Sequence, residues 1–171
     1  TVTLSVTDDA GATSSSSKTI LIREIHRDLL PPDPGSSSLT PLAGIDVDAD
    51  GIRDDVEHGI HELYPLDKEM RTVMNFGARA LQMAMLAGAS GIGVDSAAAE
   101  VSTWASCMAA LQVRDNLDID FATKEMSKVD VLTFNTSERV VAKLGFESAL
   151  DGTASAFAEV NITDCDIGEG V

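Results

Sequence analysis

A run of carboxylates at residues 46–57, "DVDADGIRDDVE", holds the side chains of this chain that are best suited to chemistry. Aspartates alternate with small or apolar residues at Asp46, Asp48 and Asp50, and a glutamate closes the run at Glu57. A hard cation such as calcium takes about six to eight oxygen ligands, which a short loop provides only from alternating side chains. A solvated acidic stretch has no reason to alternate, so the spacing predicts that this loop binds Ca²⁺.

The same residues resemble the calcium loop of an EF-hand, whose ligands stand at positions 1, 3, 5, 7, 9 and 12 around a glycine at position 6. The resemblance implies a sharp turn at Gly51 and a set of ligands from both side chains and main chain. These are Asp46, Asp48, Asp50, the main-chain carbonyl of Ile52, Asp54 directly or through water, and Glu57.

Two departures distinguish this loop from a paired EF-hand. Arg53 stands at position 8, where the paired loop has an aliphatic residue, and a proline- and glycine-rich segment replaces the entering helix. The loop is therefore more similar to the single loops of thrombospondin type 3 repeats and to dockerin loops. A dockerin needs two such loops and this sequence has one, so we predict no binding to cohesin. We predict that the ion has a structural role.

Other side chains give weaker functional signals. His58 and His61 lie one helical turn apart, a spacing that could hold a transition metal, but no third ligand follows nearby and solvent-facing positions are favoured. His26 has less support still. Motifs of the G-x-S-x-G and H-E-x-x-H types and a phosphate-binding glycine loop are absent from the sequence, so we predict no enzymatic activity.

The chain has two cysteines, Cys107 and Cys165, which form either a disulfide or two buried thiols. Extracellular features elsewhere in the chain favour the disulfide. Closing a loop of this length would stabilise the fold by about 4 kcal/mol in the chain-entropy model.

The elements that flank the acidic loop are predicted to be strands before it and helices after it. Residues 1–22 alternate apolar and polar side chains at Val2–Val6, turn near Gly11 and resume at Ile20–Ile22, which predicts two antiparallel strands. The stretches "TVTLSVTDDAGAT" and "KTILI" resemble the last strands of a PKD domain, an immunoglobulin-like sandwich common in secreted microbial proteins. Residues 23–45 contain four of the five prolines and a serine run, so we predict a linker.

From residue 46 to residue 171 the chain is predicted to form a helical domain, which makes the fold mainly α. Helical periodicity predicts four or five helices, at about 54–64, 66–87, 96–113, 119–133 and 137–150, with Trp104 in the core. Asn135 and Glu138 have capping-box spacing, and "FAEVNI" near the end could form a short strand. Asn135 and Asn161 also lie in glycosylation acceptor motifs. The calcium loop followed by amphipathic helices resembles uncharacterised secreted proteins of bacteria.

Charge limits the partners of this chain. Its 12 basic and 28 acidic residues give a net charge of −16, which argues against extended contact with nucleic acid or an anionic membrane. No stretch reaches the roughly 18 apolar residues of a spanning helix, so membrane insertion is not expected. Because the first residue is threonine, we expect a processed chain or a fragment.

Together these features predict a non-enzymatic, calcium-stabilised structural or binding module, secreted or on the cell surface, with the periplasm as a further location. Its partner would be a protein, a surface glycan or a second copy of itself. One alternative is a subunit of a self-assembling extracellular filament or lattice, in which the N-terminal strands add to a neighbour. A second alternative is an accessory domain of an extracellular hydrolase.

Overall fold

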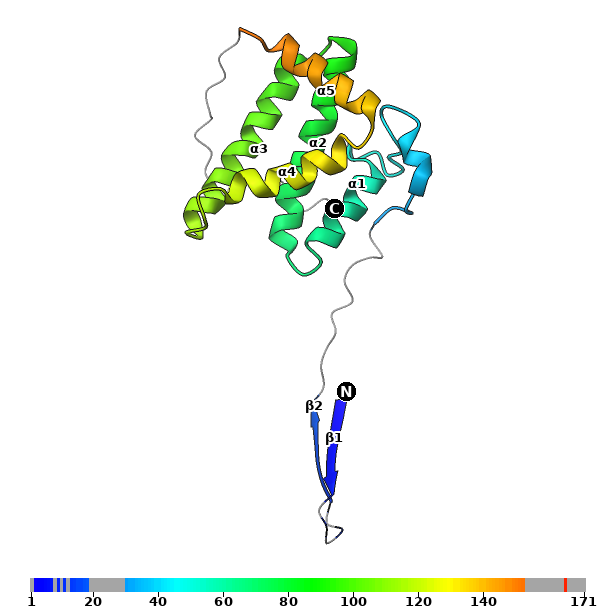
Figure 1. Cartoon of the computed structure of the whole chain (residues 1–171), viewed down its shortest axis with the longest axis vertical. Helices are drawn as coiled ribbons and strands as arrows, with labels where there is room; N and C mark the ends of the chain where they lie inside the picture. Colours follow the sequence, from blue (N-terminus) through cyan, green and yellow to red (C-terminus); the bar gives the residue numbers. More distant parts are fainter. Residues whose placement is uncertain are drawn as a thin grey trace.

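A computed structural model describes residues 2–7, 9, 11, 13–18, 30–152 and 165 of the chain. Among these residues it contains a two-stranded sheet near the N-terminus and five α-helices between residues 54 and 149 (Figure 1). The prediction of a mainly α fold with four to five helices is confirmed.

The N-terminal sheet pairs β1, Val2–Thr7, with β2, Thr13–Lys18, in antiparallel register. Thr7 lies opposite Thr13, and their hydroxyl oxygens are 3.0 Å apart. The second strand thus begins earlier than predicted, because the short turn around Gly11 reverses the chain at once and pairs the serine run. The predicted strand residues Ile20–Ile22 lie outside the described residues.

The helices lie close to their predicted ranges. They are α1, Asp54–Leu63; α2, Lys68–Ser90; α3, Val94–Arg114; α4, Phe121–Thr133; and α5, Ser137–Ala149. The capping-box prediction is one residue off: the N-cap of α5 is Thr136, whose hydroxyl accepts a hydrogen bond from the amide of Arg139 at 3.3 Å.

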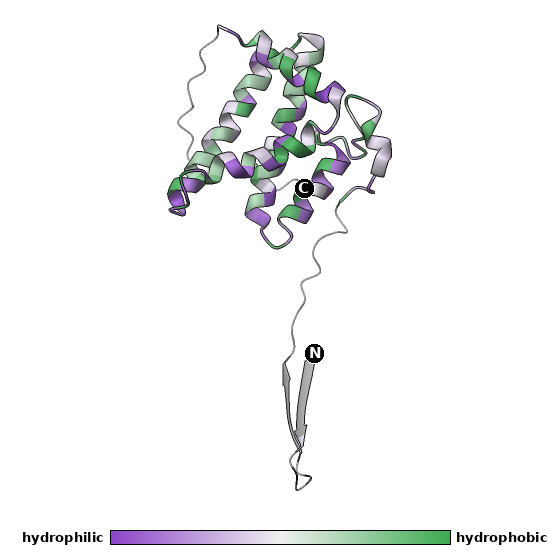
Figure 2. Cartoon of the chain, viewed as in Figure 1, coloured by the Kyte–Doolittle hydropathy of each residue, from purple (hydrophilic) through white to green (hydrophobic). Residues whose placement is uncertain are grey.

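The core forms around α2, which packs against each of the other four helices. Hydrophobic and hydrophilic residues are interspersed along the helices (Figure 2). Trp104 on α3 is 1% exposed, and the buried methionines Met74, Met85 and Met108 surround the same core. The prediction that Trp104 lies in the core is therefore confirmed. None of the helices in the described residues is long and apolar enough to cross a membrane.

The segment before the acidic loop packs against the helices, although the sequence assigns it to a linker. It contains a short 3-10 helix, η2, Gly35–Leu39, and it is held by Arg139 of α5, which is 0% exposed. The Arg139 guanidinium donates to the carbonyl oxygens of Leu42 at 3.1 Å and Pro41 at 2.9 Å. Residues 30–45 therefore belong to the helical domain in packing terms, and its boundary lies upstream of the predicted residue 46.

Two further side chains hold this segment. Gln82 of α2 donates to the Ala43 carbonyl at 2.7 Å, and a ring nitrogen of His58 lies 2.7 Å from the Pro31 carbonyl. All of these bonds go to main-chain oxygens, which any residue carries. The proline and serine content of the segment therefore gave no sign of them.

The remaining predictions about the chain ends concern residues that the structure does not describe. Residues 23–29 of the linker, with His26, and residues 153–164, with the predicted strand and Asn161, lie outside the described ranges.

Candidate metal centre

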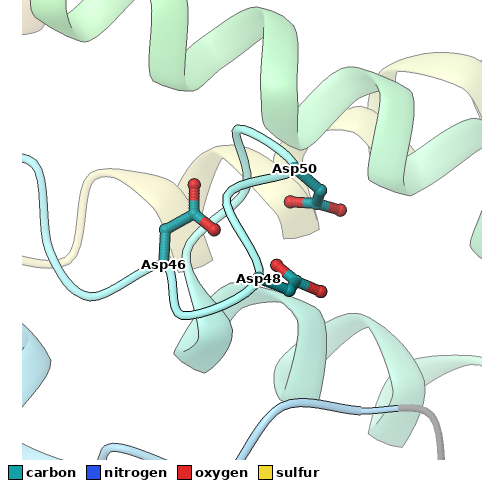
Figure 3. Close-up of side chains that lie close together, drawn as sticks. All are labelled: Asp46, Asp48 and Asp50. Atoms are coloured by element: carbon teal, nitrogen blue, oxygen red, sulfur yellow. The ribbon is translucent and has the colours of Figure 1, made fainter.

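The acidic loop brings its carboxylates together just before α1. Oxygens of Asp46, Asp48 and Asp50 lie within 4.8 Å of one another, and Figure 3 shows these side chains along the curve of the loop. A second group, also within 4.8 Å, joins Asp48 to Asp54 and Glu57 in the first turn of α1. Because Asp48 belongs to both groups, all five predicted carboxylate ligands converge on one region.

Hydrogen bonds across its base close the loop. The amide of Asp54 donates to the Ile45 carbonyl at 2.9 Å, and the Val47 amide donates to Asp54 Oδ1 at 3.0 Å. The chain that enters the loop is thereby joined to the first residue of α1 by one main-chain and one side-chain acceptor. Asp54 is thus fixed at the point where the loop becomes helix.

Further bonds shape the tip of the loop. The Gly51 amide donates to Asp46 Oδ2 at 3.0 Å, and the Ile52 amide donates to Asp50 Oδ1 at 2.8 Å. Gly51 has a φ of 91°, in the region that favours glycine, as the predicted sharp turn requires. The side chain of Ile52 is buried at 5% exposed, while the role of its carbonyl as a ligand stays a prediction.

Two of the carboxylates are buried without enough partners. Asp54 is 0% exposed and Glu57 is 7% exposed. Among the described residues, Asp54 Oδ2, Glu57 Oε2 and Asp46 Oδ1 are buried oxygens with no hydrogen-bond donor. Unpaired buried anionic oxygens are costly unless a cation or a proton neutralises them.

The burial and the closeness of these carboxylates raise the pKa values of two of them. Burial, followed by repulsion from the four neighbouring aspartates, raises the pKa of Glu57 to about 8. Burial also raises the pKa of Asp50, with Asp48 and Asp46 adding to the rise. Without a cation, the cluster would therefore hold a proton on Glu57 at neutral pH.

The donor set fits a hard divalent cation. Its side-chain donors are all carboxylate oxygens, and hard cations such as calcium and magnesium favour oxygen ligands, whereas softer metals favour nitrogen and sulfur. Neither His58 nor His61 belongs to a group of potential metal ligands in the described part of the chain. His61 is buried at 8% exposed, so the predicted solvent-facing position is wrong for it.

No protein-family model, curated protein or solved structure matches this chain. The resemblances to PKD domains, to EF-hands and to thrombospondin type 3 repeats therefore stay predictions.

The two cysteines also meet. Cys107 of α3 and Cys165 are joined by a disulfide with an S–S distance of 2.11 Å, and both residues are buried. This bond ties a residue near the end of the chain to the helical core.

Two arginines near the loop were not predicted to have a role. Arg79 of α2 packs against the turn, since a Cβ added at Gly51 would lie 3.3 Å from Arg79 Cγ, and its charge partly offsets the rise in the pKa of Asp50. Arg53 is 0% exposed within the loop itself. Its place at position 8 of the EF-hand pattern was the only sequence signal for it.

Proposed function

We propose that this chain is a non-enzymatic, calcium-stabilised structural and binding module that works outside the cell or at the cell surface. The observation that carries the proposal is the burial of Asp54 and Glu57, each with an oxygen lacking a donor among the described residues, beside Asp48. A bound cation would replace the missing donors and offset the repulsion.

Calcium suits the site better than magnesium. Calcium accepts six to eight oxygens in flexible geometry, whereas magnesium demands a near-ideal octahedron and usually keeps several waters. The five carboxylates offer up to ten oxygens, with the Ile52 carbonyl as the further predicted ligand. Such a set can supply most of the shell of a large ion.

The ion would act as a structural clamp. Asp46, Asp48 and Asp50 follow the packed segment of residues 30–45, while Asp54 and Glu57 lie in the first turn of α1. Calcium shared between them would join this segment to the helix. At a concentration of 100 times Kd, binding to the folded state alone stabilises it by about 2.7 kcal/mol.

An extracellular location accords with two features. Calcium outside cells is abundant enough to fill weak sites of extracellular modules, and disulfides such as Cys107–Cys165 persist in oxidising compartments. The partner in this proposal is a protein or a surface glycan.

Isothermal titration calorimetry and thermal melting, in millimolar calcium and in chelator, test the proposal. Calcium should bind with one-to-one stoichiometry and raise the melting temperature. Asp48→Asn should weaken binding because Asp48 belongs to both carboxylate groups, whereas Asp118→Asn, at an exposed site away from the loop, should not. An unchanged melting temperature in chelator would refute the structural role.

A second candidate function is assembly through the N-terminal strands. The sheet in the described residues has only two strands, β1 and β2, so each strand has an outer edge that could accept a strand from another chain. Two strands alone are marginal in water, which favours such an addition. Light scattering after size exclusion, with and without residues 1–22, tests it. An oligomer size that the deletion leaves unchanged would exclude this assembly.

A further inference from the structure

Arg53 occupies an unusual position in the acidic loop. It stands between Ile52 and Asp54, two of the predicted ligands, yet its side chain is 0% exposed and donates to main-chain oxygens of α4. A buried guanidinium is retained only when its donors are satisfied, so its partners show what it holds.

The first partners of Arg53 are main-chain oxygens at the end of α4. Nη1 donates to the Thr133 carbonyl at 2.8 Å, and Nη2 donates to the Leu132 carbonyl at 3.0 Å. The last carbonyls of a helix lack partners within the helix. Arg53 thus caps the C-terminus of α4 from the loop, about 80 residues away in sequence.

A second set of bonds orients the guanidinium. Nε and Nη2 donate to the two carboxylate oxygens of Asp55, each at 2.9 Å, in the bidentate geometry that fixes an arginine fork. The Nδ2 amide of Asn135 donates to Asp55 Oδ2 at 3.2 Å. Both carboxylate oxygens of Asp55 thus accept hydrogen bonds, which fixes the orientation of the Arg53 fork.

The same corner between α4 and α5 also reaches the other side of the loop. Asn135 Oδ1 accepts hydrogen bonds from both Arg53 and Arg139, and Arg139 holds the carbonyls of Ser38, Pro41 and Leu42. The chain entering the loop and the chain leaving it are therefore fastened to one corner by two arginines.

The aliphatic stem of Arg53 is fixed as well. A Cβ added at Gly44, two residues before the first ligand, would lie 2.0 Å from Arg53 Cδ. Only glycine lets the entering chain pass this close, so the stem of Arg53 and the start of the loop pack directly against each other.

We propose that Arg53 is a positioning residue of the calcium site, which holds the Ile52–Asp54 stretch in its binding geometry by fastening it to the α4–α5 corner. This inference rests on the proposed calcium function. A single loop has no second loop to brace it, and the helical domain supplies the brace through Arg53. By reciprocity, calcium binding in turn strengthens the bonds of Arg53 to Leu132 and Thr133.

Calcium affinity and carbonyl chemical shifts of the full chain test the inference together. Arg53→Met should raise the calcium Kd by about tenfold or more, as loss of a group that orients metal ligands commonly does. Arg53→Lys, which keeps the charge but not the fork, should fold and give an intermediate Kd. Tyr64→Phe, a matched control that removes a hydrogen bond at the far end of α1, should leave Kd unchanged.

The spectroscopic measurement separates positioning from general stabilisation. In the wild-type chain, added calcium should shift the ¹³C carbonyl resonances of Leu132 and Thr133 together with the amide of Gly51. In Arg53→Lys the Gly51 amide should still move, while the two carbonyls move less.

Each outcome has a distinct meaning. A wild-type chain that binds no calcium would overturn the calcium function and this inference with it. The positioning role of Arg53 would be overturned, and the calcium function kept, by either of two results. One is that both Arg53 variants bind calcium with the wild-type Kd. The other is that the carbonyl resonances of Leu132 and Thr133 do not respond to calcium in the wild type.

Discussion

Glu57 provides the sharpest test of the buried carboxylate cluster, because its replacement should stabilise the protein in one condition and impair it in another. In Glu57→Gln the shape of the side chain is kept and its charge is removed. Without calcium this relieves a buried anion that lacks a donor, whereas with calcium it removes a ligand.

The size of the effect follows from the pKa of Glu57, which burial and then the neighbouring aspartates raise from 4.5 to about 8. Between these pH values the folded, ion-free chain keeps a proton that the unfolded chain has lost, so its stability falls as pH rises and levels off above about 8. At about 1.4 kcal/mol for each pH unit, the upper limit of the loss is about 4–5 kcal/mol, and screening by solvent reaching the cluster lowers it. For a domain of this size that corresponds to about 10–20 °C in melting temperature.

The loss of stability can be measured by thermal melting at pH 8.5 of the protein with its disulfide intact, monitored by circular dichroism. In chelator, Glu57→Gln should melt above the wild type by up to the amount just given, and its melting temperature should depend less on pH between 5 and 8. Calcium should raise the melting temperature of the wild type and leave that of Glu57→Gln almost unchanged. Glu62→Gln, at an exposed position of the same helix, is the matched control and should behave as the wild type.

A lower melting temperature for Glu57→Gln than for the wild type in chelator would refute the reasoning. It would mean that ionised Glu57 is stabilised by the fold itself, and the case for a cation at this site would lose its main support.

Three further changes have defined outcomes. Arg79→Gln removes a positive charge near Asp50, so calcium affinity at low salt should rise by about two- to fivefold, and an unchanged affinity would place Arg79 outside the field of the site. Replacing Cys107 and Cys165 with serine opens a disulfide spanning 58 residues and should cost about 4 kcal/mol in urea unfolding; a loss below about 1 kcal/mol would contradict this. Tyr64→Phe removes the hydroxyl that donates to Glu125 and should cost about 1–2 kcal/mol, while equal stability would show that water replaces the bond.

The helices and the carboxylate cluster could be predicted because each depends on particular types of side chain that recur at a fixed spacing. Apolar residues recur with helical period around Trp104, and aspartates alternate through Asp50 before Gly51. Both patterns are local in sequence, and the helices of the structure begin and end within a few residues of their predicted ends.

What the sequence did not reveal depends on main-chain acceptors and on contacts between distant segments. Residues 30–45 looked like a linker because their packing comes from carbonyl oxygens bound by Arg139 and Gln82, which lie far along the chain. Asn135 looked like a helix cap, but its amide serves Arg53 and Asp55, and the neighbouring Thr136 caps the helix. Such pairings require the tertiary fold.

The attachment of residues 30–45 also determines how mechanical load would pass through this molecule. A pull on the chain upstream of Leu30 would first load the bond between His58 and Pro31, and then the bonds of Arg139 and Gln82. Along the chain, force would pass through these bonds to α1, α5 and α2 before it reaches Asp46, the first carboxylate of the acidic loop. A segment whose composition resembles a simple tether would therefore take up load ahead of Asp46, Asp48 and Asp50.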